Sequence, residues 1–159
     1  IGVEPAKIAE AIGKFGGAGR RFEIHGTVNG VTIADDYAHH PEEITATLNA
    51  AQDMGFNKVW AVFQPFTYSR TKMLLDDFAT SLQIADRVVM TEIMGSREVN
   101  TIGIYTKDLA EKIPGSVWFD TFDEVEEYVM SHAESGDLVI TMGCGDVYKI
   151  AKSIVAKNK

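Results

Sequence analysis

Residues 59–90 read VWAVFQPFTYSRTKMLLDDFATSLQIADRVVM, and this stretch decides the fold. It begins with Val59–Phe63, a short apolar run of the type found in strands that are buried on both faces. A stripe of apolar side chains at helical spacing follows, consisting of Leu74, Leu75, Phe78 and Leu82. Asp86–Met90 is a second run of the buried-strand type. A strand, a helix and a strand in this order predict a β-α-β unit with two parallel strands.

The same alternation extends along the rest of the chain. Helices are expected over residues 3–15, 41–51, 106–113, 122–130 and 147–154, and strands over 22–28, 31–37, 117–119 and 138–142. Asn29-Gly30 separates the first two strands and predicts a type I′ hairpin, because both turn residues of that hairpin need φ > 0. We therefore predict an α/β fold: a Rossmann-like, mainly parallel sheet with helices on both faces and an N-terminal β-hairpin.

Length and charge narrow the class of protein. The chain has 159 residues, a length typical of one domain. Its 15 Lys and Arg against 23 Asp and Glu give a net charge of −8, which argues against nucleic acid or an anionic membrane as partner. With one cysteine, no membrane-length apolar run and no visible signal peptide, we expect a cytoplasmic protein without disulfides. The start at Ile1 rather than Met suggests a fragment or a processed product.

Ligands of parallel sheets bind beyond the carboxyl ends of the strands, so the strand-to-helix junctions are the candidate sites. The first junction, DDYAHHP at residues 35–41, holds two carboxylates, a phenol and two imidazoles. Carboxylates suit ribose hydroxyls or a substrate amine, and a neutral imidazole suits a carboxylate or phosphate. The alternatives are a polar loop that caps the next helix, and a metal site, although no second His or Cys cluster would complete the metal shell. A phospho-acceptor receiver domain would need an aspartate where the chain has Gln64.

The second junction is Gln64–Thr71, which ends a buried strand and opens a helix. Arg70 lies near the expected helix start, where the helix dipole is already positive. Two positive features side by side favour an anion between them, such as phosphate or carboxylate. The alternative is a surface arginine that pairs with Asp76 or Asp77.

The third junction, Gly143-Cys144-Gly145-Asp146, follows strand 138–142. Its two glycines permit close approach of the backbone to a ligand, and the next helix offers free amides. The alternative is a tight turn with Asp146 as the helix N-cap, and the dinucleotide fingerprint is incomplete because position 148 is Tyr. Cys144 is expected to be a small buried residue rather than a nucleophile.

Arg20 and Arg21 form the remaining charged pair. At the start of a strand they should point to opposite faces, so that one pairs with Glu23 or faces solvent while the other reaches a ligand. The chain contains no G-x-x-x-x-G-K-[ST] phosphate loop, no G-x-S-x-G and no H-E-x-x-H. Arginines at strand ends are therefore the groups that would meet an anionic substrate here.

Four motifs, taken in order and with their spacing, resemble the C-terminal domain of the Mur ligases. They are RRFE at 20–23, DDYAHHPEEI at 35–44, FQP with YSRT within 63–71, and MGCGD at 142–146. The resemblance implies that residues 1–19 are the end of the family's central domain and a hinge, and that 20–159 are the C-terminal domain. It implies ATP-dependent amide-bond formation through an acyl phosphate, in the synthesis of peptidoglycan precursors in the bacterial cytoplasm. The His39-His40-Pro41 version implies UDP-N-acetylmuramate and L-alanine as substrates.

The resemblance also implies a division of labour. ATP and Mg²⁺ would be held mainly by the central domain and the UDP-sugar by the N-terminal domain, both acting in cis and both outside this sequence. The implied ATP contacts here are Arg21, Asp36 and Tyr37, and the implied substrate contacts are His39, His40, Arg70, Gly143, Gly145 and Asp146. No metal ligand and no complete catalytic site are expected in this chain, so the isolated domain should be inactive. Two positions depart from the family's usual residues: Phe66 stands in place of His, and Cys144 in place of Ala.

Two alternatives stay open. The acceptor of the same UDP-sugar could be a recycled tripeptide instead of L-alanine. The chain could instead be a stand-alone nucleotide-binding or regulatory module.

Overall fold

The structure, a computed structural model, describes residues 2–13 and 19–158. In this part of the chain six strands form one sheet in the order β1-β2-β6-β3-β4-β5. The strands are β1 (Glu23–Val28), β2 (Val31–Asp36), β3 (Val59–Phe63), β4 (Arg87–Thr91), β5 (Val117–Phe119) and β6 (Leu138–Met142). β1 is antiparallel to β2, and all other neighbours are parallel. The predicted α/β fold with its N-terminal hairpin is confirmed.

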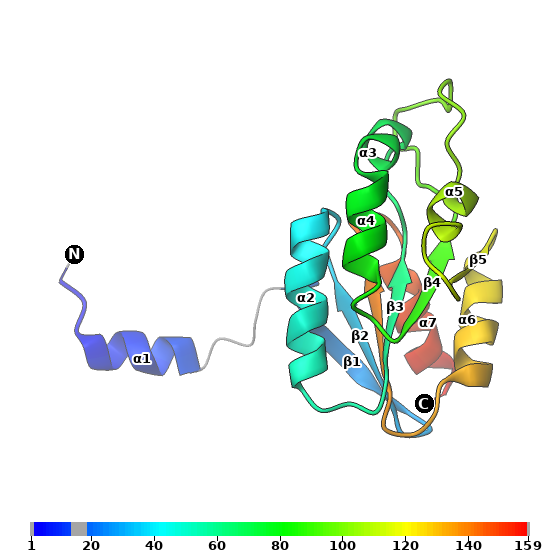
Figure 1. The fold of residues 1–159 in the computed structure, drawn as a ribbon. Helices are drawn as coiled ribbons and strands as arrows, with labels where there is room; N and C mark the ends of the chain where they lie inside the picture. The colour runs from blue at the N-terminus through cyan, green and yellow to red at the C-terminus, as the bar shows by residue number, and fades with distance from the viewer. Residues whose placement is uncertain (1, 14–18, 159) are drawn as a thin grey trace.

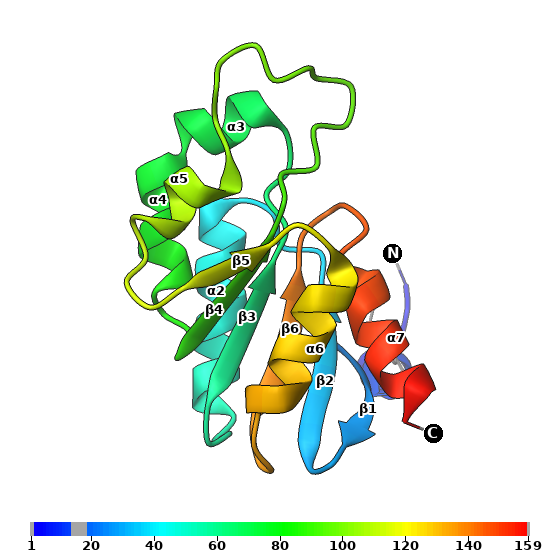
Figure 2. The same ribbon diagram turned by 90° about the vertical axis from the view of Figure 1, so that its right-hand side faces the viewer.

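Helices cover both faces of the sheet. The helices of the described residues are α1 (Pro5–Gly13), α2 (Pro41–Asp53), α3 (Tyr68–Met73), α4 (Leu75–Leu82), α5 (Thr106–Ala110), α6 (Phe122–His132) and α7 (Tyr148–Lys157), and α1 lies apart from the sheet. Figure 1 shows α2 and α4 in front of the sheet, with α7 behind it. In the turned view of Figure 2, α2, α4 and α5 lie on one side of the sheet, and α6 and α7 on the other.

The period-two alternation of the central strands builds two hydrophobic cores. On β3, Val59, Ala61 and Phe63 face the core under α2, α4 and α5. Trp60 and Val62 face the core under α6 and α7. All residues of β3 and β6 are buried, which explains why these strands read as continuous apolar runs.

The hairpin turn has the predicted geometry, with φ of 51° at Asn29 and 83° at Gly30. One expected helix is divided in two. Leu74, with φ of −110°, ends α3 and precedes α4, so the helix expected after the second junction begins as a six-residue piece. The expected hinge at residues 16–19 lies, apart from Gly19, outside the described residues, and the division at 1–19 stays a prediction. No helix among the described residues is both long enough and apolar enough to cross a membrane.

Candidate functional site

The sheet order brings the three junctions together, because β6 lies between β2 and β3. Met142, the last residue of β6, is in register with Asp36 on one side and with Phe63 on the other. The amide of Gly143 donates to the Asp36 carbonyl at 3.2 Å, and the amide of Gln64 donates to the Met142 carbonyl at 3.1 Å. The loops that follow the three strands therefore start side by side at the carboxyl edge.

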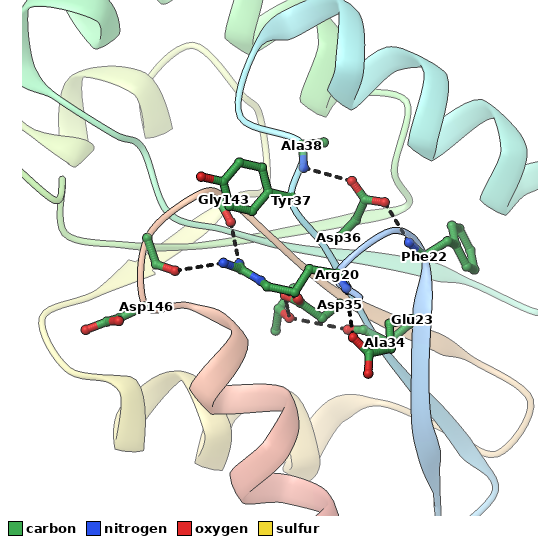
Figure 3. A network of polar contacts seen from close by, with 12 residues as sticks. Arg20, Phe22, Glu23, Ala34, Asp35, Asp36, Tyr37, Ala38, Gly143 and Asp146 are labelled. Atoms are coloured by element: carbon green, nitrogen blue, oxygen red, sulfur yellow. Dashed lines mark hydrogen bonds and ion pairs between the residues drawn. The ribbon is translucent and has the colours of Figure 1, made fainter. Parts of the chain in front are cut away.

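Asp36 ties two segments of this edge together (Figure 3). Its side chain is buried, and each carboxylate oxygen accepts one backbone amide at 2.8 Å, Oδ2 from Phe22 and Oδ1 from Ala38. The carboxylate thus joins the turn that precedes β1 to the loop that follows β2. Any ribose contact would be made in addition to these bonds.

The two arginines point in different directions, as predicted, but strand alternation is not the reason. They precede β1 in a turn where Arg20 and Phe22 have φ of 58° and 47°, so the two-residue alternation of a strand does not apply. Arg20 turns inward, and its guanidinium pairs with Asp35 rather than with Glu23. The contact with Glu23 is made by the Arg20 amide, at 2.7 Å. Arg21 is exposed, and its guanidinium carbon lies 5.9 Å from the centre of the Tyr37 ring.

The loop from Tyr37 to His40 combines helix capping with an exposed Tyr37 ring and a half-buried His39 ring. The amides of His39 and His40 donate to Glu43 Oε2 at 3.0 and 3.3 Å, so the capping interpretation accounts for part of this motif. Partial burial acts to raise the pKa of the Glu43 carboxyl, but the His39 amide, the His39 ring, the His40 amide and Arg21 together hold it below its usual value. The Tyr37 and His39 rings meet edge to face, with centres 5.4 Å apart.

His40 is the N-cap residue of α2 and lines a cleft between α2 and α4. The cleft has a volume of about 450 Å³ and is also lined by Thr45, Asp77 and Thr80. His40 therefore faces the cleft between α2 and α4, whose lining includes neither Tyr37 nor His39.

Arg70 lies close enough to the glycine turn for its charge to oppose the rise in the pKa of the Cys144 thiol, but the electrostatic reason expected from the sequence does not hold. A helix as short as α3 lacks the aligned peptides of a long macrodipole, so the argument from a helix start fails. The surface alternative does not hold at Asp76 either, because that carboxylate pairs with Lys112 at 2.7 Å. Within the described part of the chain, Nη1 of Arg70 is buried and has no hydrogen-bond partner. A buried guanidinium nitrogen without an acceptor still suits an anion.

The glycine turn after β6 is packed against Gln64. Gly143 has φ of 144°, and a Cβ added there would lie 3.0 Å from the Gln64 carbonyl oxygen. The Asp146 amide donates to Gln64 Oε1 at 3.0 Å, while the Asp146 carboxylate pairs with Lys149 at 2.8 Å. Asp146 is not the N-cap of α7 as one alternative supposed, because Val147 occupies that position. Gln64 is the positioning residue that the sequence argument missed, and its place directly after β3 was the available signal.

Cys144 is less buried than expected from the sequence, but the state of its thiol fits the expectation that it is not a nucleophile. It is partly buried, and burial raises the pKa of its thiol against a smaller opposing effect of Arg70 and Arg20. A thiol with a raised pKa is protonated at neutral pH and is a poor nucleophile.

Replacement of Gly143 by alanine is expected to lower the free energy of unfolding by about 1–3 kcal/mol, because the new Cβ meets a backbone oxygen in a conformation that disfavours side chains. Urea unfolding followed by tryptophan fluorescence measures the change. Gly55→Ala is the matched control, since Gly55 also has a positive φ but has no atom within 4 Å of an added Cβ. Equal losses for the two variants would contradict the packing argument.

A family model described as "Mur ligase, glutamate ligase domain" matches residues 20–145, which hold Arg20, Asp36, Arg70 and the glycine turn. The chain belongs to the Mur ligase family. The resemblance inferred from the four motifs is confirmed, although Asp146 lies just beyond the matched residues.

Relatives of this Mur ligase domain include the UDP-N-acetylmuramate–L-alanine ligase of Lachnospira eligens, 47% identical over 98% of this chain and 35% of the relative. A solved structure of the UDP-N-acetylmuramate–alanine ligase of Thermotoga maritima matches with a TM-score of 0.79 and 25% identity, over 98% of this chain and 33% of that one. The murein peptide ligase of Psychrobacter arcticus matches with a TM-score of 0.71 and 26% identity, over 98% of this chain and 33% of that one. The chain thus spans about a third of the length of these Mur ligases.

Proposed function

We propose that this Mur ligase domain serves an ATP-dependent ligase that joins L-alanine to UDP-N-acetylmuramate in the bacterial cytoplasm. The observation that carries the proposal is the 47% identity, over nearly the whole chain, with a relative that bears the name of this reaction. Because the chain spans 35% of that relative, the full activity is attributed to the longer protein and not to this domain alone.

On the nucleotide side, we assign ATP contacts to Arg21, Asp36 and Tyr37. Arg21 is exposed beside the Tyr37 ring, so its charge is available to a phosphate. Asp36 fixes the backbone on both sides of this pair through Phe22 and Ala38. The proposal therefore gives Asp36 two tasks, a ribose contact and the placement of Arg21.

On the substrate side, we assign contacts to His39, His40, Arg70, Gly143, Gly145 and Asp146. The buried Nη1 of Arg70, which has no acceptor among the described residues, supports an anionic partner such as the substrate carboxylate or its phosphate. The Gly143 turn lies at the same edge, beside Gln64.

In the proposed reaction, the muramate carboxylate takes the terminal phosphoryl group of ATP and ADP leaves. The amine of L-alanine then attacks the acyl carbon, loses a proton and displaces phosphate. Among the described residues of this chain, no group of three or more His, Cys, Asp or Glu could hold a metal ion. We assign Mg²⁺, and most of the ATP site, to the rest of the longer protein, because this chain spans 35% of the relative that bears the name of the reaction.

An acyl phosphate is lost to water, so such a site must close before the reaction and open afterwards. Arg21 and Arg70, carried on one domain, would then stabilise phosphate charge only in the closed state. This arrangement makes the domain necessary for turnover although it holds only part of the site.

The test measures ADP release by the full-length protein with ATP, Mg²⁺ and UDP-N-acetylmuramate, while the acceptor is varied. We expect release that depends on L-alanine and a product that carries one new amide bond. Release driven by tripeptide but not by L-alanine would instead identify a murein peptide ligase.

Titration calorimetry of this chain with ATP tests the alternative of a stand-alone module. We expect binding weaker than a Kd of about 1 μM, which corresponds to about −8 kcal/mol, because the domain supplies only part of the nucleotide site. Tighter binding by this chain alone would favour a stand-alone nucleotide-binding module over the proposed function.

A further inference from the structure

We propose that Arg20 is a positioning residue that holds the glycine turn after β6 and the Tyr37 ring in one fixed arrangement. The effect of this role on ligase activity rests on the proposed function, whereas the effect of Arg20 on the glycine turn does not. Arg20 differs from Arg21 in its exposure. Arg21 is exposed to solvent, whereas the Arg20 side chain is 23% exposed and points into the edge of the sheet.

The Arg20 guanidinium spans two segments that are far apart in the sequence (Figure 3). Nη2 donates to the Gly143 carbonyl at 2.6 Å, and Nη1 donates to the Gly145 carbonyl at 3.4 Å. Nε donates to Asp35 Oδ2 at 2.8 Å. One side chain therefore fixes both glycine carbonyls of the turn relative to β2.

Two aromatic rings complete the setting of this guanidinium. Its carbon lies 4.9 Å from the centre of the Tyr37 ring and 4.6 Å from the centre of the Tyr148 ring. Tyr148 is the first residue of α7, and Tyr37 is the residue that we assign to ATP. Cation–π contact with both rings links the start of α7, the turn and the nucleotide side of the site.

The charge of Arg20 is balanced inside the protein. Asp35 is fully buried, and its second oxygen, Oδ1, accepts a hydrogen bond from Thr141 Oγ1 at 2.8 Å. Arg20 compensates this buried carboxylate, and its donors point at protein carbonyls. We therefore assign Arg20 a structural role and assign phosphate binding to Arg21 and Arg70.

The shape of the guanidinium distinguishes this role from a simple ion pair. A planar fork with five donors can serve Asp35, Gly143 and Gly145 at once, and its flat face stacks on rings. A lysine ammonium can keep the pair with Asp35 but cannot reproduce the same set of contacts. Arg20→Lys therefore separates positioning of the turn from charge compensation.

The experiment compares full-length wild type with Arg20→Lys by hydrogen–deuterium exchange and by steady-state kinetics. The Gly143 and Asp146 amides are hydrogen-bonded in the turn, to the Asp36 carbonyl and to Gln64 Oε1. We expect exchange in a peptide covering residues 143–148 to rise at least about tenfold, with β3 and β6 unchanged. We also expect kcat/KM to fall about 10–100-fold at equal melting temperature.

Arg87→Lys is the matched control, since Arg87 is an exposed arginine at the opposite end of the sheet that donates to the Asp86 carbonyl. It should change neither readout. Tyr148→Leu is the second variant, because it removes one ring without touching the pair with Asp35, and a smaller rise in exchange of the turn is expected.

If the turn exchanged at the wild-type rate in both Arg20→Lys and Tyr148→Leu, the proposal would be overturned. A uniform rise in exchange through the whole sheet would overturn it too, since that result describes a role in stability alone. A loosened turn with unchanged kcat/KM would refute the link to turnover. If wild-type protein lacks ligase activity, the proposed function fails while the exchange result still decides the role of Arg20.

Discussion

Replacement of Arg21 by alanine is expected to lower the ligase activity of the full-length protein by about 10²–10³-fold, the loss typical of removing one preorganised group that stabilises charge in a transition state. Arg21 is exposed, and its guanidinium carbon lies 5.9 Å from the centre of the Tyr37 ring, so the substitution removes charge without opening a core. We expect the free energy of unfolding to change by no more than about 0.5 kcal/mol. Alanine-dependent ADP release at saturating substrates measures the activity.

Arg87→Ala is the control for this prediction, because it removes an exposed arginine from the opposite end of the sheet. Its activity should match that of wild type. Near-wild-type turnover by Arg21→Ala would refute the role assigned to Arg21. A large loss of activity together with a large loss of stability would show that Arg21 acts through the fold and not through the phosphate.

The apolar pattern was sufficient to predict the sheet. β3 and β6 are buried on both faces, so Val59–Phe63 and Leu138–Met142 could hardly be placed elsewhere. The Asn29-Gly30 turn was equally clear, since few residue pairs accept two positive φ angles. The division of α3 from α4 at Leu74 was not predictable, because neither glycine nor proline marks the break.

The same limits apply to the site. Sequence placed the three junctions at one edge, because parallel strands share their carboxyl ends. The residues alone could not tell Arg20 from Arg21, since the turn that separates their directions puts Arg20 and Phe22, two residues other than glycine, at positive φ. Only the family resemblance assigned the ATP contact to Arg21. The hydrogen-bond acceptors of the Arg20 guanidinium lie 15, 123 and 125 residues away, and only the folded sheet brings them together.

The adjacent aspartates Asp35 and Asp36 have different partners because they lie on the same strand, β2. They point to opposite faces of β2, Asp35 towards Thr141 and Arg20, and Asp36 towards the Phe22 and Ala38 amides. The residues alone made both equally good ribose acceptors, and only the family resemblance selected Asp36. The structure shows that both carboxylates are buried and already accept hydrogen bonds within the protein.

Replacement of Asp36 by alanine is therefore expected to lower the free energy of unfolding of this chain by about 3–5 kcal/mol, because two backbone amides in a partly closed edge lose their acceptors together. Urea unfolding measures the loss, and Asp53→Ala, which removes an exposed carboxylate at the end of α2, should stay within about 0.5 kcal/mol of wild type. Asp36→Asn keeps one acceptor oxygen and should lose roughly half as much.

The graded series separates the two tasks proposed for Asp36. If the carboxylate served only a ribose hydroxyl, all three proteins would unfold at the same urea concentration and differ only in their use of ATP. If it holds the backbone, stability falls from Asp to Asn to Ala, and Arg21 loses its fixed place because its neighbour Phe22 is released. The activity of Asp36→Asn is then compared with that of wild type per folded molecule. The loss of activity that remains in this comparison is the part that a ribose contact explains.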